Sequence, residues 1–292
     1  MNLARVTAAI LICLSLATPA SAEGSTPFAR IAEDERNQPQ ALQVAIANYG
    51  LNSGDRQIRV DLVSAIHIGD KAYYAGLNER FKTYDALLYE LIAPKDTVVG
   101  RDGSDPKGFI SNTQVTMKNL LDLSFQLDEI DYSARNFVHA DLSPEELSQS
   151  MQERGESVYV YFWRLFYASM NQYARDPLGL GEMKKVSSML SAGTDNTFKV
   201  LLAYELVEPK NYQAILGEDA DSAVIGARNQ RAIDVLREQL RSGKRNIAIF
   251  YGVAHMPDLE QRLTQQLGFA WLNSTWIDAW QLDDGPDDQA AR

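Results

Sequence analysis

The sequence predicts an α/β protein with a mixed central sheet, helices on both faces, and a helical insertion between the N-terminal and C-terminal strands. Three apolar segments carry this prediction, at residues 58–68, 86–92 and 247–254. Strands that are continuously apolar are typical of a sheet that is covered on both faces. Because two of these segments lie early in the chain and one lies late, the sheet is expected to join distant parts of the sequence.

The first two strands enclose a predicted helix, which makes them a βαβ unit. Asp70 is expected to cap this helix. One helical face carries the apolar side chains Tyr73, Tyr74, Leu77 and Phe81. A βαβ connection implies that its two strands are parallel.

The middle of the chain is predicted to be mostly helical. Ser143, Pro144 and Glu146 form a capping box that starts one helix. A last helix is expected between Pro257 and Gly268, before a closing strand. The further helices are expected at residues 107–126, 158–170, 197–216 and 227–241, and the closing strand at residues 275–282.

Both ends of the chain are expected to lie outside one folded domain at residues 46–282. Residues 1–22 contain a positive start, an apolar run and an Ala-x-Ala ending, which is typical of a cleaved signal peptide. The apolar run is too short for a stable membrane anchor, so a periplasmic or secreted protein is expected. Residues 23–45 indicate a polar leader, and residues 283–292 indicate an acidic disordered tail.

Charge and cysteine content exclude several classes of function. The formal net charge is −11, which disfavours nucleic acid and anionic membranes as partners. Cys13 is the single cysteine and lies in the signal peptide, so the mature chain is expected to have no disulfide and no thiol nucleophile. A peptide or small-molecule substrate remains compatible, and the sequence does not fix the oligomeric state.

Two of the three histidines occupy equivalent places in the sequence. His67 and His255 each follow an apolar strand and each precede, by three residues, an aspartate that starts a helix. In open α/β sheets, ligands bind outside the carboxyl ends of the strands. The small residues Gly252 and Ala254 would permit a close approach there. His139 is expected to be structural.

Glu90 ends the second strand and is the third candidate. An unpaired carboxylate buried in such a run is very costly. Two imidazoles and one carboxylate can hold a divalent metal, or one of these groups can act as a general base on water. The structural alternatives are a satisfied histidine at a strand end and a glutamate that faces solvent or pairs with an arginine.

These segments resemble the TraB family. The resemblance rests on His67, on the stretch Tyr84-Asp85-Ala86-Leu87-Leu88-Tyr89-Glu90, on Gly252-x-x-His255, and on Arg228-Asn229 one helix upstream of it. It extends over roughly residues 58–282. Ser64 departs from the pattern, because the family usually has glycine at that position.

The resemblance implies a fold shared with erythromycin esterases, ChaN-like proteins and Tiki metalloproteases. It implies a metal-dependent hydrolase, peptidase-like, with manganese or cobalt held by His67, Glu90 and His255. Arg228 is then expected to pair with Glu90 or to stabilise the negative charge of a substrate carboxylate or oxyanion, with a surface ion pair as its structural alternative. Asn229 and Tyr74 are assigned to substrate binding, with a helix cap and a core aromatic as their structural alternatives.

Three other functions remain open at this point. Bacterial TraB or GumN-like members leave open a protein that sequesters a peptide or small ligand without turnover. A metal-free, esterase-like hydrolase with a histidine base is a second alternative. Haem binding is the least favoured, because no histidine or tyrosine is assigned to it.

Overall fold

The computed structural model describes residues 27–53, 56–94, 124–156, 197–207 and 222–283, which form a mixed α/β fold. Its main sheet has seven strands in the order β1-β2-β3-β8-β5-β7, and β9 pairs with β2. The strands are β1 (Ala29–Glu33), β2 (Pro39–Ser53), β3 (Arg56–Ala65), β5 (Ala86–Tyr89), β7 (Phe137–His139), β8 (Asn246–Gly252) and β9 (Ala270–Gln281). The sheet therefore joins the start and the end of the chain, as predicted.

One half of the sheet is parallel and contains the predicted βαβ unit. Strands β3, β8, β5 and β7 all run in the same direction. Helix α1 (Lys71–Phe81) connects β3 to β5 and buries its predicted apolar face. However, β3 and β5 are not neighbours, because β8 pairs with both of them. Almost every residue of β8 is buried, so this strand takes the centre of the parallel half.

The other half of the sheet is antiparallel, and it includes residues that the sequence predicts as a polar leader. Residues 23–45 were expected to be loosely held, but β1 begins at Ala29 and β2 begins at Pro39. Leu42 and Val44 belong to one apolar cluster and Ala45 and Tyr49 to the other, so successive residues of β2 bury both faces of this strand. β2 pairs with both β1 and β9, and the folded domain therefore starts well before residue 46.

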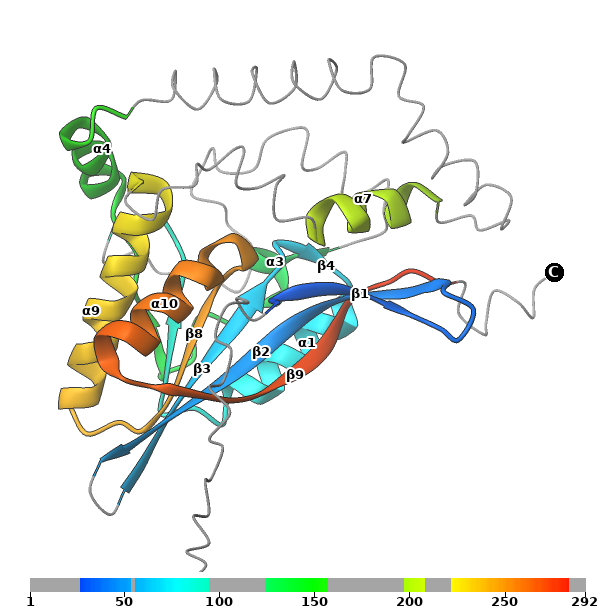
Figure 1. Ribbon diagram of the computed structural model, residues 1–292. Coiled ribbons are helices and arrows are strands. Elements are labelled where there is room, and N and C mark those ends of the chain that lie inside the picture. The colour runs from blue at the N-terminus through cyan, green and yellow to red at the C-terminus, as the bar shows by residue number, and fades with distance from the viewer. Residues whose placement is uncertain (1–26, 54–55, 95–123, 157–196, 208–221, 284–292) are drawn as a thin grey trace, which may run out of the picture.

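Helices cover both faces of the sheet, as the sequence predicts. Helices α1 and α7 (Thr197–Val207) pack in one apolar cluster with the first face. Helices α9 (Arg228–Arg241) and α10 (Met256–Leu267) pack in a second cluster on the opposite face. Figure 1 shows α9 and α10 in yellow and orange on one side of the strands, and α1 behind them.

The region between the parallel strands is only partly described. Helix α4 (Pro144–Glu153) has the predicted capping box, with both the Ser143 and Glu146 side chains bonded to backbone. The helix expected up to Gln126 is interrupted, because β6 (Ser124–Phe125) pairs with β4 (Ile68–Gly69) and α3 (Gln126–Glu129) follows. The remaining expected helical stretches, at residues 107–123, 158–170 and 208–216, lie outside the described residues.

The predicted signal peptide and most of the acidic tail also lie outside the described residues. In the part of the chain that is described, no helix combines the length and apolar character needed to cross a membrane.

Candidate functional site

The carboxyl ends of the four parallel strands bring the site together. His67 follows β3, Glu90 follows β5, and Asp141 follows β7. Gly252 ends β8, and the 3-10 turn η2 (Val253–His255) comes directly after it. Because parallel strands end at the same edge, residues far apart in the sequence meet here.

The loop that carries His67 is held by hydrogen bonds to its backbone carbonyls. Tyr74 Oη donates to the carbonyl of Ile66, at 2.9 Å. Gln126 N donates to the carbonyl of His67, and Trp280 Nε1 donates to that of Ile68. These donors come from α1, α3 and β9, so an exposed imidazole stands on a fixed backbone.

The side chain of His67 is held at one ring nitrogen. Its Nδ1 lies 3.2 Å from Gln126 Oε1. The Gln126 amide oxygen faces the imidazole, and the amide nitrogen donates to the Tyr132 hydroxyl at 2.8 Å. In this orientation of the amide the oxygen can only accept, and Nδ1 carries the proton. The lone pair of Nε2 is left on the side of Gly252, where a Cβ would lie 3.4 Å from Nε2.

His255 is held in the same way, but in the interior. Its Nδ1 lies 2.7 Å from Asn229 Oδ1. Asn229 Nδ2 donates to the carbonyl of His255 and to Asp258 Oδ2, and both of these atoms can only accept. The orientation of the Asn229 amide is thereby fixed, and His255 Nδ1 must carry the proton. Its Nε2 then accepts from Arg228 Nη1 at 3.3 Å.

A buried ion network joins Glu90 to Arg228 and Asp141. Arg228 Nη2 lies 2.6 Å from Glu90 Oε1 and 2.6 Å from Asp141 Oδ2. Arg228 Nε donates to Asp141 Oδ1 at 2.9 Å, so the Asp141 pair is bidentate. The π-helical turn η1 (Ala223–Ala227) precedes α9 and places Arg228 at the start of that helix. Of the two roles predicted for Arg228, the structure shows the pairing with Glu90.

Gly252 lies closely packed against two candidate side chains of the site. Its backbone N–H donates to Glu90 Oε2 at 2.6 Å. A Cβ at this position would lie 3.3 Å from Glu90 Oε2 and 3.4 Å from His67 Nε2. The close approach at this small residue is made by two candidate site side chains, whereas the sequence predicted a ligand or a neighbouring backbone there.

The environment sets the charges of the site. Burial lowers the pKa of His255, Glu90 opposes this effect and Arg228 adds to it, and the resulting pKa is about 4. Burial alone would raise the pKa of Glu90. The two imidazoles in their protonated forms, the Arg228 charge and the Gly252 N–H outweigh burial, and the pKa of Glu90 lies below its ordinary value. At neutral pH, His255 is therefore neutral and Glu90 is ionised.

The three predicted metal ligands, His67, Glu90 and His255, lie close together at this edge of the sheet. Among the described residues, no group of three or more histidine, cysteine, aspartate or glutamate side chains is placed to hold a metal ion. Both Glu90 oxygens accept hydrogen bonds, and Arg228 contacts both Glu90 Oε1 and His255 Nε2, which lie 3.5 Å from each other. Two of the three predicted ligands thus already contact a positive group.

Two predicted substrate-binding residues have other contacts. Tyr74 is fully buried and bonds to the His67 loop, so it is the core aromatic that its structural alternative describes. Asn229 is also fully buried and orients His255. His139 lies outside the centre, with its Nε2 2.6 Å from the carbonyl of Leu91.

Sequence reasoning missed two residues that complete the site. Asp141 follows β7, whose three half-buried residues give no clear strand pattern. A signal did exist, because Asp141 stands just after a strand, as Glu90 does. Gln126 was placed at the end of a helix that is not continuous in the structure, and nothing in its own sequence context marked it.

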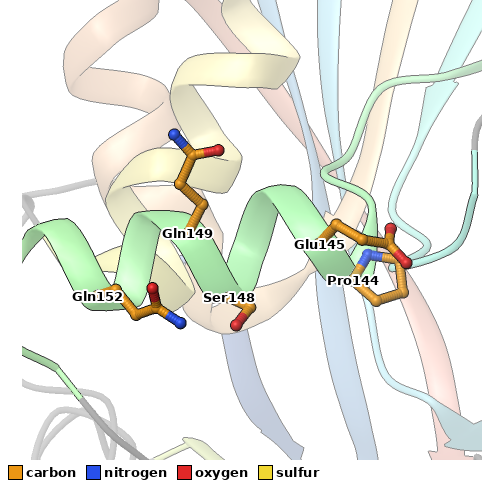
Figure 2. Close-up of a pocket in the computed structure, with 5 residues that line it drawn as sticks. All are labelled: Pro144, Glu145, Ser148, Gln149 and Gln152. Atoms are coloured by element: carbon orange, nitrogen blue, oxygen red, sulfur yellow. The ribbon is translucent and has the colours of Figure 1, made fainter.

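A shallow hollow on α4 lies outside this centre. It has a volume of about 400 Å³ and is lined by Pro144, Glu145, Ser148, Gln149 and Gln152. Figure 2 shows these side chains along a single helix, and none of them belongs to the candidate site.

The fold and the site define an α/β protein with a His/Glu/Arg centre at the carboxyl edge of its parallel strands. No protein-family model, curated protein or solved structure matches the chain. The resemblance to the TraB family therefore stays a prediction that rests on the motifs themselves.

Proposed function

We propose that this protein is an exported hydrolase that acts on a peptide or a related small carbonyl substrate. In this proposal His67 is the general base. Its Nε2 takes a proton from water while the water oxygen attacks the carbonyl carbon, and that proton then passes to the leaving group. Glu90 stabilises the imidazolium that forms between these steps.

One observation carries the proposal. His67 is exposed, and its Nδ1 is held by an amide while its Nε2 faces the Glu90 carboxylate across Gly252. A general base needs an accessible lone pair of fixed direction, and a neighbouring anion favours its protonated form. His255 does not meet the first need, because it is buried and accepts from Arg228.

Arg228 supports the proposal through its charge. It is held by two carboxylates and lies at the start of α9, so its guanidinium is fixed before substrate arrives. A fixed positive group in a site that excludes water stabilises an oxyanion that develops nearby. This is the role that the sequence analysis assigned to Arg228.

Metal dependence is a separate proposal that the TraB resemblance supports. His67, Glu90 and His255 would be the residues to hold manganese or cobalt, which would supply a Lewis acid. Since Arg228 contacts both Glu90 and His255, a cation would have to compete with it for these two ligands. The hydrolytic proposal above does not depend on the outcome.

The test is hydrolysis by the purified full chain, first after chelation and then with added manganese or cobalt. A casein-derived peptide mixture is followed by mass spectrometry, and a nitrophenyl ester by absorbance. We expect turnover that falls at least about 100-fold in Glu90→Gln and in His67→Gln. His139→Gln is the matched control and should keep full activity. Activity after chelation separates the metal-free form from the metal-dependent one.

A second candidate is a protein that sequesters a ligand without turnover. It is favoured by the saturation of Glu90, since each of its oxygens already accepts a short hydrogen bond. This candidate predicts that a peptide from the same mixture is retained in stoichiometric amount and recovered intact. Hydrolysis that depends on His67 would exclude it.

A further inference from the structure

The two imidazoles of the site make the same kind of contact, in which Nδ1 faces a side-chain amide oxygen. His67 Nδ1 faces the side-chain amide oxygen of Gln126, and His255 Nδ1 faces that of Asn229. The two amides come from different elements, α3 and α9. Both leave the Nε2 lone pair on the side of the ion network. The arrangement is therefore a matched pair of supports, of which the sequence indicated only Asn229.

We propose that Gln126 is a positioning residue that holds His67 in the tautomer with Nδ1 protonated and Nε2 free.

Three contacts give Gln126 this role. Its backbone N–H donates to the carbonyl of His67 at 2.9 Å, so the same residue holds the backbone and the ring. Its side chain is almost fully buried, at 4% exposure, which limits its other orientations. Its amide nitrogen is occupied by the Tyr132 hydroxyl, which is itself buried against Tyr89.

The third histidine provides the contrast that makes the role measurable. His139 Nε2 lies 2.6 Å from the carbonyl of Leu91, and a carbonyl can only accept. His139 therefore carries a proton on Nε2, whereas His67 and His255 carry theirs on Nδ1. With three histidines in the chain, the ring nitrogens can be assigned individually.

The kinetic consequence rests on the proposed function. Residues that orient a catalytic or ligating histidine through its other nitrogen typically change activity by about 10- to 100-fold when they are removed. Gln126 does not reach the substrate in this scheme. We therefore expect its loss to lower kcat and to leave KM nearly unchanged.

The test is nitrogen NMR of ¹⁵N-histidine-labelled protein at neutral to mildly alkaline pH. The wild-type chain should show Nδ1–H at His67 and His255, and Nε2–H at His139. Gln126→Leu removes the acceptor and should release His67 to carry its proton on Nε2. Gln126→Glu keeps an acceptor oxygen and should retain the wild-type tautomer. The other two histidines should be unchanged in both variants.

Each outcome bears on one proposal. A proton on Nε2 of His67 in the wild-type chain would overturn the inference. This measurement needs no variant, so the inference can be tested even if Gln126→Leu does not fold. An unchanged His67 tautomer in a folded Gln126→Leu also overturns it. The expected tautomers in a protein that hydrolyses nothing would support the role of Gln126 and count against the proposed function.

Discussion

The two histidine regions of the site have the same local support and opposite surroundings. His255 is buried in contact with Arg228, and its imidazole is kept neutral. His67 is exposed, on a loop in which the carbonyls of residues 66–68 all accept hydrogen bonds. In the proposed function, His255 stabilises the buried ion network of Glu90, Arg228 and Asp141, whereas His67 contacts the substrate. The following substitutions test this distinction, from the largest expected effect on stability to the smallest.

Removal of Arg228 should have the largest effect. Arg228→Leu leaves the carboxylates of Glu90 and Asp141 buried without their cation, and this should lower the free energy of unfolding by about 3–5 kcal/mol. Urea denaturation measures the change. Arg237→Leu is the matched control, because its partner Asp234 is half exposed and the pair contributes about 1 kcal/mol or less. Equal effects of the two substitutions would contradict a stabilising network.

Acidification should be the next largest effect, and it acts through His255. The pKa of this imidazole is about 4 in the folded chain and 6.5 as its ordinary value, so protonation favours unfolding. The stabilisation is complete above pH 6.5 and is lost as pH falls towards 4, by about 3 kcal/mol. The lowered pKa of Glu90 adds a further loss at lower pH.

Urea midpoints between pH 7.5 and pH 4.5 measure this loss, with the range set by the two pKa values of the imidazole. His255→Gln should flatten the slope. A slope that persists in His255→Gln would place the acid sensitivity elsewhere in the chain.

Addition of a side chain at Gly252 should have an intermediate effect on stability. Gly252→Ala places a methyl group 3.3 Å from Glu90 Oε2, which forces a shift and should cost about 1–3 kcal/mol. Gly76 in α1 has nothing within 4 Å, so Gly76→Ala should instead stabilise by up to about 1 kcal/mol. Thermal unfolding of both variants measures the contrast, and a Gly252→Ala protein as stable as Gly76→Ala would refute the close packing at Gly252.

His67 itself should affect stability least. It is exposed, so His67→Ala should change the free energy of unfolding by about 0.5 kcal/mol or less, while it removes hydrolysis. His255→Ala should cost several times more stability. Equal losses of stability in these two variants would remove the proposed distinction between the two regions.

The sequence predicted the parts of this site that follow strongly apolar strands. His67, Glu90 and His255 each come after such a strand, and the carboxyl ends of parallel strands share one edge of the sheet. Arg228 and Asn229 followed from the motif resemblance, and the structure places both against His255.

Three features were not predictable, for different physical reasons. Asp141 follows the three-residue strand β7, which is too short for periodicity to mark it. Gln126 acts through a contact across 59 residues that no local pattern encodes. The sequence predicts a polar leader where β1 and the start of β2 lie, because residues 29–40 are mostly charged or amide side chains and the apolar run of β2 begins only at Ala41.

The pairing of β2 with β9 has a consequence for the biogenesis of the protein. The early strands pair with strands that come late in the chain, β3 with β8 and β2 with β9. Trp280, which lies in β9, also donates a hydrogen bond to the loop that carries His67. Contacts of such long sequence separation slow folding. A nascent chain would thus stay incompletely folded until β9 is synthesised.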